Sequence, residues 1–175
     1  MRIKEELPLH RSEEAAEDIA HYKEDLYERE ELKEEVRELI IFRLYREWYG
    51  IEIGKVKEVI KVSKITYLPS SPEYIAGIVN LRGNILSVTD LKTVLSLPHE
   101  ELTEKTRIIA VESGIMETGF LADEVVDSIE VPISKIESPL LTIPPEGAKY
   151  IEGQCRVDNK LIALINVEKV LEKTV

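Results

Sequence analysis

The side chains that could carry chemistry in this sequence are few and scattered. Its three histidines are His10, His21 and His99, and none has the spacing to a cysteine or another histidine that a metal site requires. The single cysteine, Cys155, has no neighbouring histidine to activate its thiol, so we expect a structural role for it. The sequence also lacks the phosphate-binding, dinucleotide-binding and nucleophile-elbow motifs. This inventory predicts a protein that is not an enzyme and that holds no cofactor and no metal.

The charge of the chain is strongly negative and unevenly distributed. The 175 residues include 23 lysines and arginines and 34 aspartates and glutamates, which gives a net charge of −11. Residues 1–39 hold 7 basic and 14 acidic residues, so much of the excess is N-terminal. Net acidity argues against a nucleic-acid partner. No apolar run approaches the roughly 18 residues that span a bilayer, and the N-terminus shows no signal-peptide core, so we expect a cytoplasmic protein that is not membrane-inserted.

The first element that must position a binding surface is an acidic helical extension. Residues 12–38 contain no glycine or proline and are rich in helix-forming residues. They carry two apolar stripes at helical spacing, the first formed by Ala15, Ile19, Tyr22 and Leu26 and the second by Leu32, Val36 and Leu39. Because the stripes point in different directions, we expect a bend near residues 27–31. Contact with a partner or a second copy of the chain through Ile19, Tyr22 and Leu26 is one interpretation, and a helix lying on its own domain is the other.

A strand pattern begins at residue 39. β-Forming residues fill positions 39–44, Tyr49-Gly50 is expected to form a turn, and a strand pattern resumes from Ile51. The tripeptide Arg82-Gly83-Asn84 predicts a turn between two further strands. Asp90 suits the N-cap of a short apolar helix that follows it.

The second half of this region repeats the first. Tyr74–Leu95 aligns with Tyr150–Leu171 without a gap. Upstream, Gly50–Ile53 aligns with Gly119–Ala122 at a slightly smaller spacing along the chain. A repeated unit of short strands with glycine and proline turns favours two pseudo-symmetric small β-barrels. Each unit alone would have a marginal core, so we expect the two to bury a shared face.

This repeat leads to a simple domain plan. We expect a helical extension over residues 1–38 and a mainly β domain over residues 39–175. The first barrel would cover approximately residues 39–100 and the second approximately residues 101–175. Exchange of strands at the ends of the barrels is compatible with this plan.

The segment Tyr74–Leu91, YIAGIVNLRGNILSVTDL, resembles the most recognisable part of the CheW family of chemotaxis coupling proteins. In that family an approach to a glycine leads into an Asn-Leu-Arg-Gly turn, and an apolar strand then ends in Asp-Leu. The resemblance covers about residues 39–175. This sequence departs from the family at Ser87, where proline is frequent, and at Gly54, where a larger apolar residue is usual.

The resemblance implies two five-stranded barrels side by side and a non-enzymatic adaptor in bacterial or archaeal chemotaxis signalling. Such adaptors join the cytoplasmic tip of a methyl-accepting chemoreceptor to the regulatory domain of a CheA-type histidine kinase, in arrays at the membrane. Carried over residue by residue, the receptor-binding groove would involve Ile53, Val56, Glu58, Gly77 and Arg82. Each residue also has an ordinary interpretation, such as strand packing for Val56, backbone conformation for Gly77 and a turn cap for Arg82.

Two alternative functions remain open from the sequence. The first is a coupling protein of a chemosensory array outside chemotaxis, with partner choice set by the N-terminal helix. The second is a small-barrel protein that binds nucleic acid or oligosaccharide, since tandem barrels serve that role elsewhere. Net acidity and the lack of clustered aromatic and basic residues weigh against the second. A pull-down with receptor fragments and with the kinase regulatory domain separates these alternatives.

Overall fold

The computed structural model describes residues 15–24, 34–139 and 144–174, and the chain divides into a unit of residues 1–35 and a unit of residues 36–175. Within the first unit, residues 15–24 are helical, and Ile19 and Tyr22 are 59% and 67% exposed. Leu26, the third predicted contact residue, lies outside the described residues, as does Leu32. No helix in the described segments is long and apolar enough to cross a membrane.

The C-terminal end of the predicted helix, at residue 38, is wrong. Residues 36–38 were expected to be helical, but they begin the strand β1, Val36–Leu44. Val36 pairs with Pro132 and Leu39 with Ile129 across the antiparallel partner strand. Strong local helix formers around Val36 are therefore overridden by pairing along a long partner strand.

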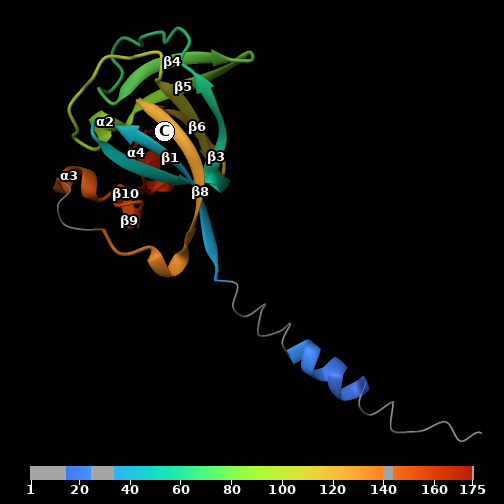
Figure 1. The fold of residues 1–175 in the computed structure, drawn as a ribbon. Coiled ribbons are helices and arrows are strands. Elements are labelled where there is room, and N and C mark those ends of the chain that lie inside the picture. Colours follow the sequence, from blue (N-terminus) through green and yellow to red (C-terminus); the bar gives the residue numbers. More distant parts are fainter. Residues whose placement is uncertain (1–14, 25–33, 140–143, 175) are drawn as a thin grey trace, which may run out of the picture. The chain divides into compact units, whose positions relative to one another are not determined.

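The second unit consists of ten strands with short helices and turns between them in the described residues (Figure 1). The strands are β1 (Val36–Leu44), β2 (Glu47–Glu52), β3 (Val56–Lys61), β4 (Ile75–Leu81), β5 (Asn84–Asp90), β6 (Arg107–Ser113), β7 (Met116–Ala122), β8 (Glu124–Pro132), β9 (Ile151–Val157) and β10 (Lys160–Ile165). The helices are α2 (Leu91–Val94), α3 (Pro145–Ala148) and α4 (Val167–Thr174), and the 3-10 turns are η1 (Ile53–Lys55) and η2 (Ile133–Lys135).

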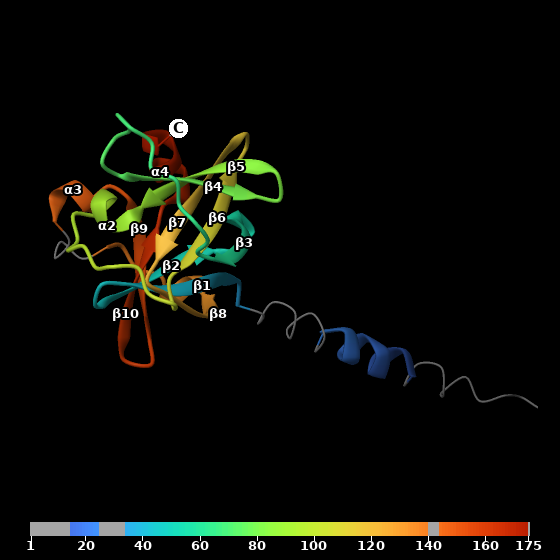
Figure 2. The same ribbon diagram turned by 90° about the horizontal axis from the view of Figure 1, so that it is seen from above.

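The strands form two five-stranded sheets, and each sheet mixes both halves of the chain. Sheet A has the order β8-β1-β2-β10-β9, and sheet B has the order β3-β6-β7-β5-β4. Figures 1 and 2 show α2 and α3 close together on one side of this unit. Strand exchange is thus far more extensive than at the ends alone. A boundary near residue 100 does not separate the two sheets.

The internal repeat is confirmed by the strand register. The parallel pair β5–β7 places Val88 opposite Gly119, and the parallel pair β10–β2 places Leu164 opposite Gly50. Val88 and Leu164 are equivalent in the first alignment of the repeat, and Gly119 and Gly50 are equivalent in the upstream one. The Asp90 N–H donates to the Tyr74 carbonyl at 2.8 Å, and the Asn166 N–H donates to the Tyr150 carbonyl at 2.8 Å, as the same repeat requires.

The prediction of closed barrels is not confirmed. Within the described residues, no ladder joins the edge strands β8 and β9 of sheet A or the edge strands β3 and β4 of sheet B. A single bridge approaches closure in each sheet, between Thr66 and Ile78 in sheet B and between Glu137 and Gln154 in sheet A. After β3 the chain continues into a loop, and after β8 it continues into η2. The two edge strands of each sheet are therefore linked through one bridge and not through a ladder of paired residues.

The predicted turn at Tyr49-Gly50 is also wrong. The chain reverses earlier, at Tyr45 and Arg46, and Tyr45 adopts a φ of 57° there. Gly50 instead lies buried inside β2, where a Cβ would meet Leu164 Cδ2 at 3.1 Å. Glycine at this position therefore serves close packing between β2 and β10.

Three clusters of buried apolar side chains hold the second unit together. The largest combines Phe42 and Tyr49 of sheet A with Ile109 and Phe120 of sheet B, and it includes residues of α2 and α4. A second cluster belongs to sheet A and contains Cys155, and a third belongs to sheet B. Because the largest cluster draws on both sheets, the two sheets stabilise each other, as the repeat predicts.

Candidate functional site

Two of the predicted receptor-binding residues meet directly in the structure. The Arg82 guanidinium donates to both carboxylate oxygens of Glu58, with Nη2 to Oε2 at 2.9 Å and Nη1 to Oε1 at 3.4 Å. The Arg82 side chain is 78% exposed, whereas Glu58 is 25% exposed. Such a pair contributes little to stability, since exposed ion pairs contribute about 0–1 kcal/mol. Its position on the surface instead makes Arg82 available to a partner.

The local sequence explains why Arg82 projects from the sheet. Arg82 and Gly83 form the two-residue turn between β4 and β5, with φ values of 52° and 87°. Hairpin turns with two positive φ values match the twist of the flanking strands and favour glycine or asparagine. The Gly83 N–H donates to Asn80 Oδ1 at 2.8 Å and locks this turn.

The Glu58–Arg82 pair spans the open side of sheet B. Glu58 lies on β3 and Arg82 follows β4, and these are the two edge strands of the sheet. The equivalent positions in sheet A, by the alignments of the repeat, are Asp127 and Asp158, which are both acidic. The ion pair is therefore a feature of sheet B and not a requirement of the repeated fold.

A small depression lies beside this pair. It has a volume of about 200 Å³, and Leu81, Ile85 and Leu86 provide its apolar lining. Lys57 and Glu117 also line it, and they form an ion pair with each other at 3.1 Å. An apolar floor beside charged side chains suits one face of an amphipathic helix.

Val56 and Ile53 lie on the same stretch of chain as Glu58. Val56 begins β3 and packs partly against the core between the sheets, and Ile53 is a half-buried residue of η1. The turn η1 is held to α4 by an ion pair between Lys55 and Glu168. The hydrogen bond from Lys55 lowers the pKa of Glu168 below its usual value.

Gly77 has a clear conformational role. It lies in β4 with a φ of 146°, and a Cβ at this position would come within 2.3 Å of the Thr66 carbonyl oxygen. Gly77 is thus buried beneath the bridge that joins Thr66 to Ile78, toward the end of β4 opposite to Arg82. The structure brings Glu58 and Arg82 together, with Val56 on the same strand as Glu58, and it places Gly77 apart from that pair.

Sequence reasoning missed Lys57 and Glu117 as members of this surface. They come from β3 and β7, and only the register of the sheet brings them together. The one signal in the sequence was the position of Lys57 beside Glu58.

The other side chain considered for chemistry is Cys155. Cys155 is buried in the apolar cluster of sheet A, and burial raises the pKa of its thiol. Within the described residues, no three histidine, cysteine, aspartate or glutamate side chains converge as metal ligands. A cleft of about 610 Å³ has Trp48, Leu97 and Leu161 among the residues that line it.

The chain was compared with known protein families, proteins and structures. Residues 38–175 match the family model of the CheW-like domain. The chemotaxis protein CheW of Bacillus subtilis is 36% identical over 135 residues, which covers 77% of this chain and 86% of that protein. The chemotaxis protein CheW of Helicobacter pylori is 28% identical over 158 residues, covering 85% and 95%. Among solved structures, the scaffolding protein TtCheW from Thermoanaerobacter tengcongensis matches with a TM-score of 0.70 and 35% identity, covering 76% of this chain and 86% of that one.

Proposed function

The chain belongs to the CheW-like family, and on this basis we propose that it is a non-enzymatic adaptor that couples chemoreceptors to a CheA-type histidine kinase in chemotaxis signalling. The main support for receptor binding is the exposed guanidinium of Arg82, which is held by Glu58 beside an apolar depression. Its position at the open side of sheet B, without a counterpart in sheet A, supports a role in recognition.

The proposed receptor site consists of Ile53, Val56, Glu58, Gly77 and Arg82. The tip of a receptor is a helical hairpin in this family, and such a helix would place its apolar side on Leu81 and Ile85. Arg82 would then share its donors between Glu58 and a carboxylate or carbonyl oxygen of the helix, because a guanidinium carries five N–H groups. Gly77 would act indirectly, by permitting the backbone that positions β4.

The kinase half of the proposal rests on the family alone. The partner would be the regulatory domain of a CheA-type kinase, in receptor arrays on the cytoplasmic side of the membrane. A coupling role in a chemosensory array outside chemotaxis is the alternative, with partner choice set by the extension.

Replacing Arg82 by alanine is expected to weaken binding of a receptor-tip fragment by about 10–100-fold, because charged hydrogen bonds contribute about 1.5–3 kcal/mol each. The melting temperature should change little, since the side chain is exposed. Titration calorimetry and thermal unfolding measure the two effects on the same protein.

Arg37 provides the matched control for this variant. It is an arginine of sheet A that forms ion pairs with Glu52 and Glu152. Arg37→Ala removes an arginine that is less exposed, at 31%, and that pairs with carboxylates in the other sheet, so it should leave receptor binding unchanged. If Arg82→Ala loses only stability while its folded fraction binds normally, the receptor site is placed wrongly. If the unmodified chain binds neither receptor tip nor kinase domain, the adaptor function itself is wrong.

Deleting residues 1–28 is expected to change the assembly state or the partner affinity and to leave the melting temperature of the β domain unchanged. Ile19 and Tyr22 are mostly exposed on their helix, so little stability should depend on them. The acidity of residues 1–39 should make the lost contact sensitive to salt. Molecular mass and affinity at low and high salt provide the measurement. Unchanged mass and affinity with a melting temperature several degrees lower would identify the extension as a brace on its own domain.

A further inference from the structure

Arg82 has a backbone conformation that its residue type disfavours. It is the first residue of the two-residue turn between β4 and β5, and its φ of 52° lies in the left-handed region. Apart from glycine, this region favours asparagine and aspartate, whose short polar side chains can form local hydrogen bonds. An arginine gains no such bond from its own side chain. The turn would therefore form more easily with another residue at position 82, and the arginine needs support from elsewhere.

The other half of the repeat forms the same turn from residues that suit it. In sheet A the turn between β9 and β10 consists of Asp158 and Asn159, with φ values of 47° and 62°. By the first alignment of the repeat, Asp158 is equivalent to Arg82, and Arg156 is equivalent to Asn80. A guanidinium has no acceptor atom, so Arg156 cannot accept a hydrogen bond from this turn. The repeated fold thus requires the turn but not an asparagine two residues before it.

Asn80 supplies the support in sheet B. Its Oδ1 accepts from the Gly83 N–H at 2.8 Å, and this N–H belongs to the peptide that follows Arg82. The peptide before Arg82 is fixed by the ladder, in which Leu81 pairs with Asn84. Because the peptides on both sides are fixed, the Cα–Cβ bond of Arg82 has one direction. Loss of the bond from Asn80 would free the second peptide and let Arg82 relax toward the conformations that an arginine prefers.

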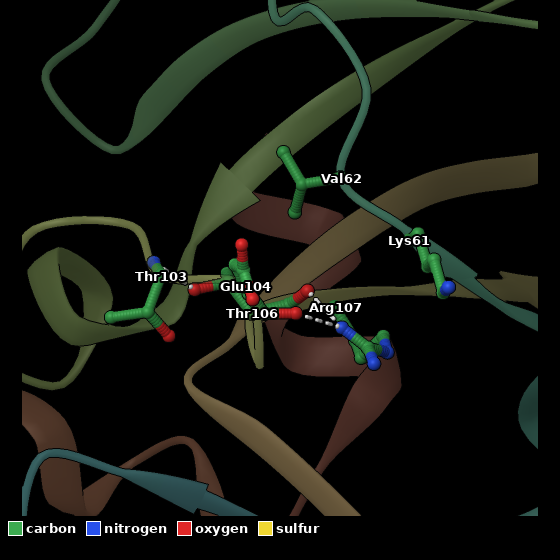
Figure 3. A pocket seen from close by; sticks show the side chains of 6 residues that line it. All are labelled: Lys61, Val62, Thr103, Glu104, Thr106 and Arg107. Atoms are coloured by element: carbon green, nitrogen blue, oxygen red, sulfur yellow. Dashed lines mark hydrogen bonds between the residues drawn. The ribbon is translucent and has the colours of Figure 1, made fainter.

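The Arg82 guanidinium depends on this direction because few other contacts hold it. Its partner in the part of the chain that the structure describes is Glu58 on β3, and the Arg82 side chain is mostly exposed. Arg107, another arginine of sheet B, shows the contrast in the pocket drawn in Figure 3. Its Nη1 donates to the carbonyls of Glu104 and Thr106 at 2.7 and 2.9 Å. The Arg107 guanidinium is therefore fixed by its own stretch of chain, whereas that of Arg82 must reach across to another strand.

We propose that Asn80 is a positioning residue of the receptor site, which holds Arg82 in the orientation that a receptor helix meets. This inference rests on the adaptor function proposed above, and it gives Asn80 no contact with the receptor. A long side chain that becomes ordered only on binding loses rotamer freedom, and the complex loses affinity. Asn80 reduces this loss because it orders Arg82 before the receptor binds.

Asn80→Ala should weaken binding of the receptor-tip fragment roughly three- to tenfold in titration calorimetry, because Arg82 must then be ordered on binding. Asn80→Asp keeps an acceptor oxygen at the same place. It should bind within about twofold of the unmodified chain at high salt, where its added charge is screened. In the Arg82→Ala background, Asn80→Ala should cause no further loss, because Asn80 acts through that side chain. Arg156→Ala is the matched change in sheet A and should leave binding unchanged.

NMR relaxation of the Arg82 Nε–H group gives a measurement that needs no receptor. Asn80→Ala should make this group more mobile, and Asn80→Asp should keep it ordered. The Nε–H group of Arg107 should be unchanged in both variants and serves as the internal reference. A role of Asn80 in the turn alone would speed hydrogen exchange of the Gly83 amide and leave the Arg82 side chain as ordered as before.

Three results would overturn the inference. They are an Arg82 side chain that stays ordered in Asn80→Ala, a receptor affinity that Asn80→Ala leaves unchanged, and a further loss of affinity when Asn80→Ala is added to Arg82→Ala. A different result would count against the adaptor function. If Asn80→Ala frees the Arg82 side chain but the unmodified chain does not bind the receptor tip, Asn80 still positions Arg82 and the proposed function is wrong.

Discussion

Replacing Asp123 by alanine is expected to lower the free energy of unfolding by about 3–5 kcal/mol, because it leaves the Lys92 ammonium buried without a counter-charge. The side chains of Lys92 and Asp123 are only 5% and 11% exposed. Asp123 follows β7 in sheet B, and its other carboxylate oxygen accepts from the Tyr45 N–H of the β1–β2 turn in sheet A at 2.6 Å. This carboxylate therefore links the two sheets, and urea unfolding should show the whole β domain losing stability in one transition.

Two variants test this explanation of the Asp123 effect. Glu124→Ala removes the neighbouring acid, which pairs with Arg43 and Lys105 at the surface, and should cost less than about 1 kcal/mol. Combining Asp123→Leu with Lys92→Met should recover part of the loss, since apolar residues can replace a buried ion pair, although the Tyr45 N–H would still lack its acceptor. A loss for Asp123→Ala no larger than that for Glu124→Ala would show that the pair is effectively solvated.

This buried pair could not be predicted from the sequence. Lysine and aspartate are expected at the surface, and nothing near Lys92 or Asp123 in the sequence indicates burial. The repeat could be predicted, because tyrosine, glycine and cap residues coincide when its two copies are aligned. The exchange of strands between sheets could not, because an alignment of Gly50 with Gly119 shows which positions are equivalent and not which strands pair.

Part of the candidate site could likewise be predicted from the sequence, and part could not. Glu58 and Arg82 could be selected from the family resemblance, and the turn at Arg82-Gly83 could be predicted from its residues. Their mutual ion pair depends on the curvature of sheet B, which brings the edge strands β3 and β4 toward each other. The sequence predicts helix for residues 36–38 because the segment is rich in helix formers, and only the pairing of Val36 with Pro132 of β8 makes these residues a strand.

Replacing Gly77 by alanine is expected to destabilise the β domain by roughly 2–4 kcal/mol, through both a strained backbone and a steric clash. The φ of 146° is unfavourable for a residue with a side chain, and the new Cβ would lie 2.3 Å from the Thr66 carbonyl oxygen. Relief requires the segment around Thr66 to move away from β4. That movement would break the paired hydrogen bonds between Thr66 and Ile78, at 2.8 and 2.9 Å, and open sheet B.

The repeat supplies the control for this variant. Gly153 is the counterpart of Gly77 in sheet A, but a Cβ there would meet the Glu137 carbonyl at 3.1 Å. Gly153→Ala should therefore cost less than about 1 kcal/mol, because a shift of a few tenths of an ångström relieves the contact. Urea unfolding gives both values, and hydrogen exchange at the Thr66 and Ile78 amides shows whether the bridge opens. If Gly77→Ala instead keeps its stability and its bridge while receptor binding falls, Gly77 contacts the receptor directly and its role is recognition and not conformation.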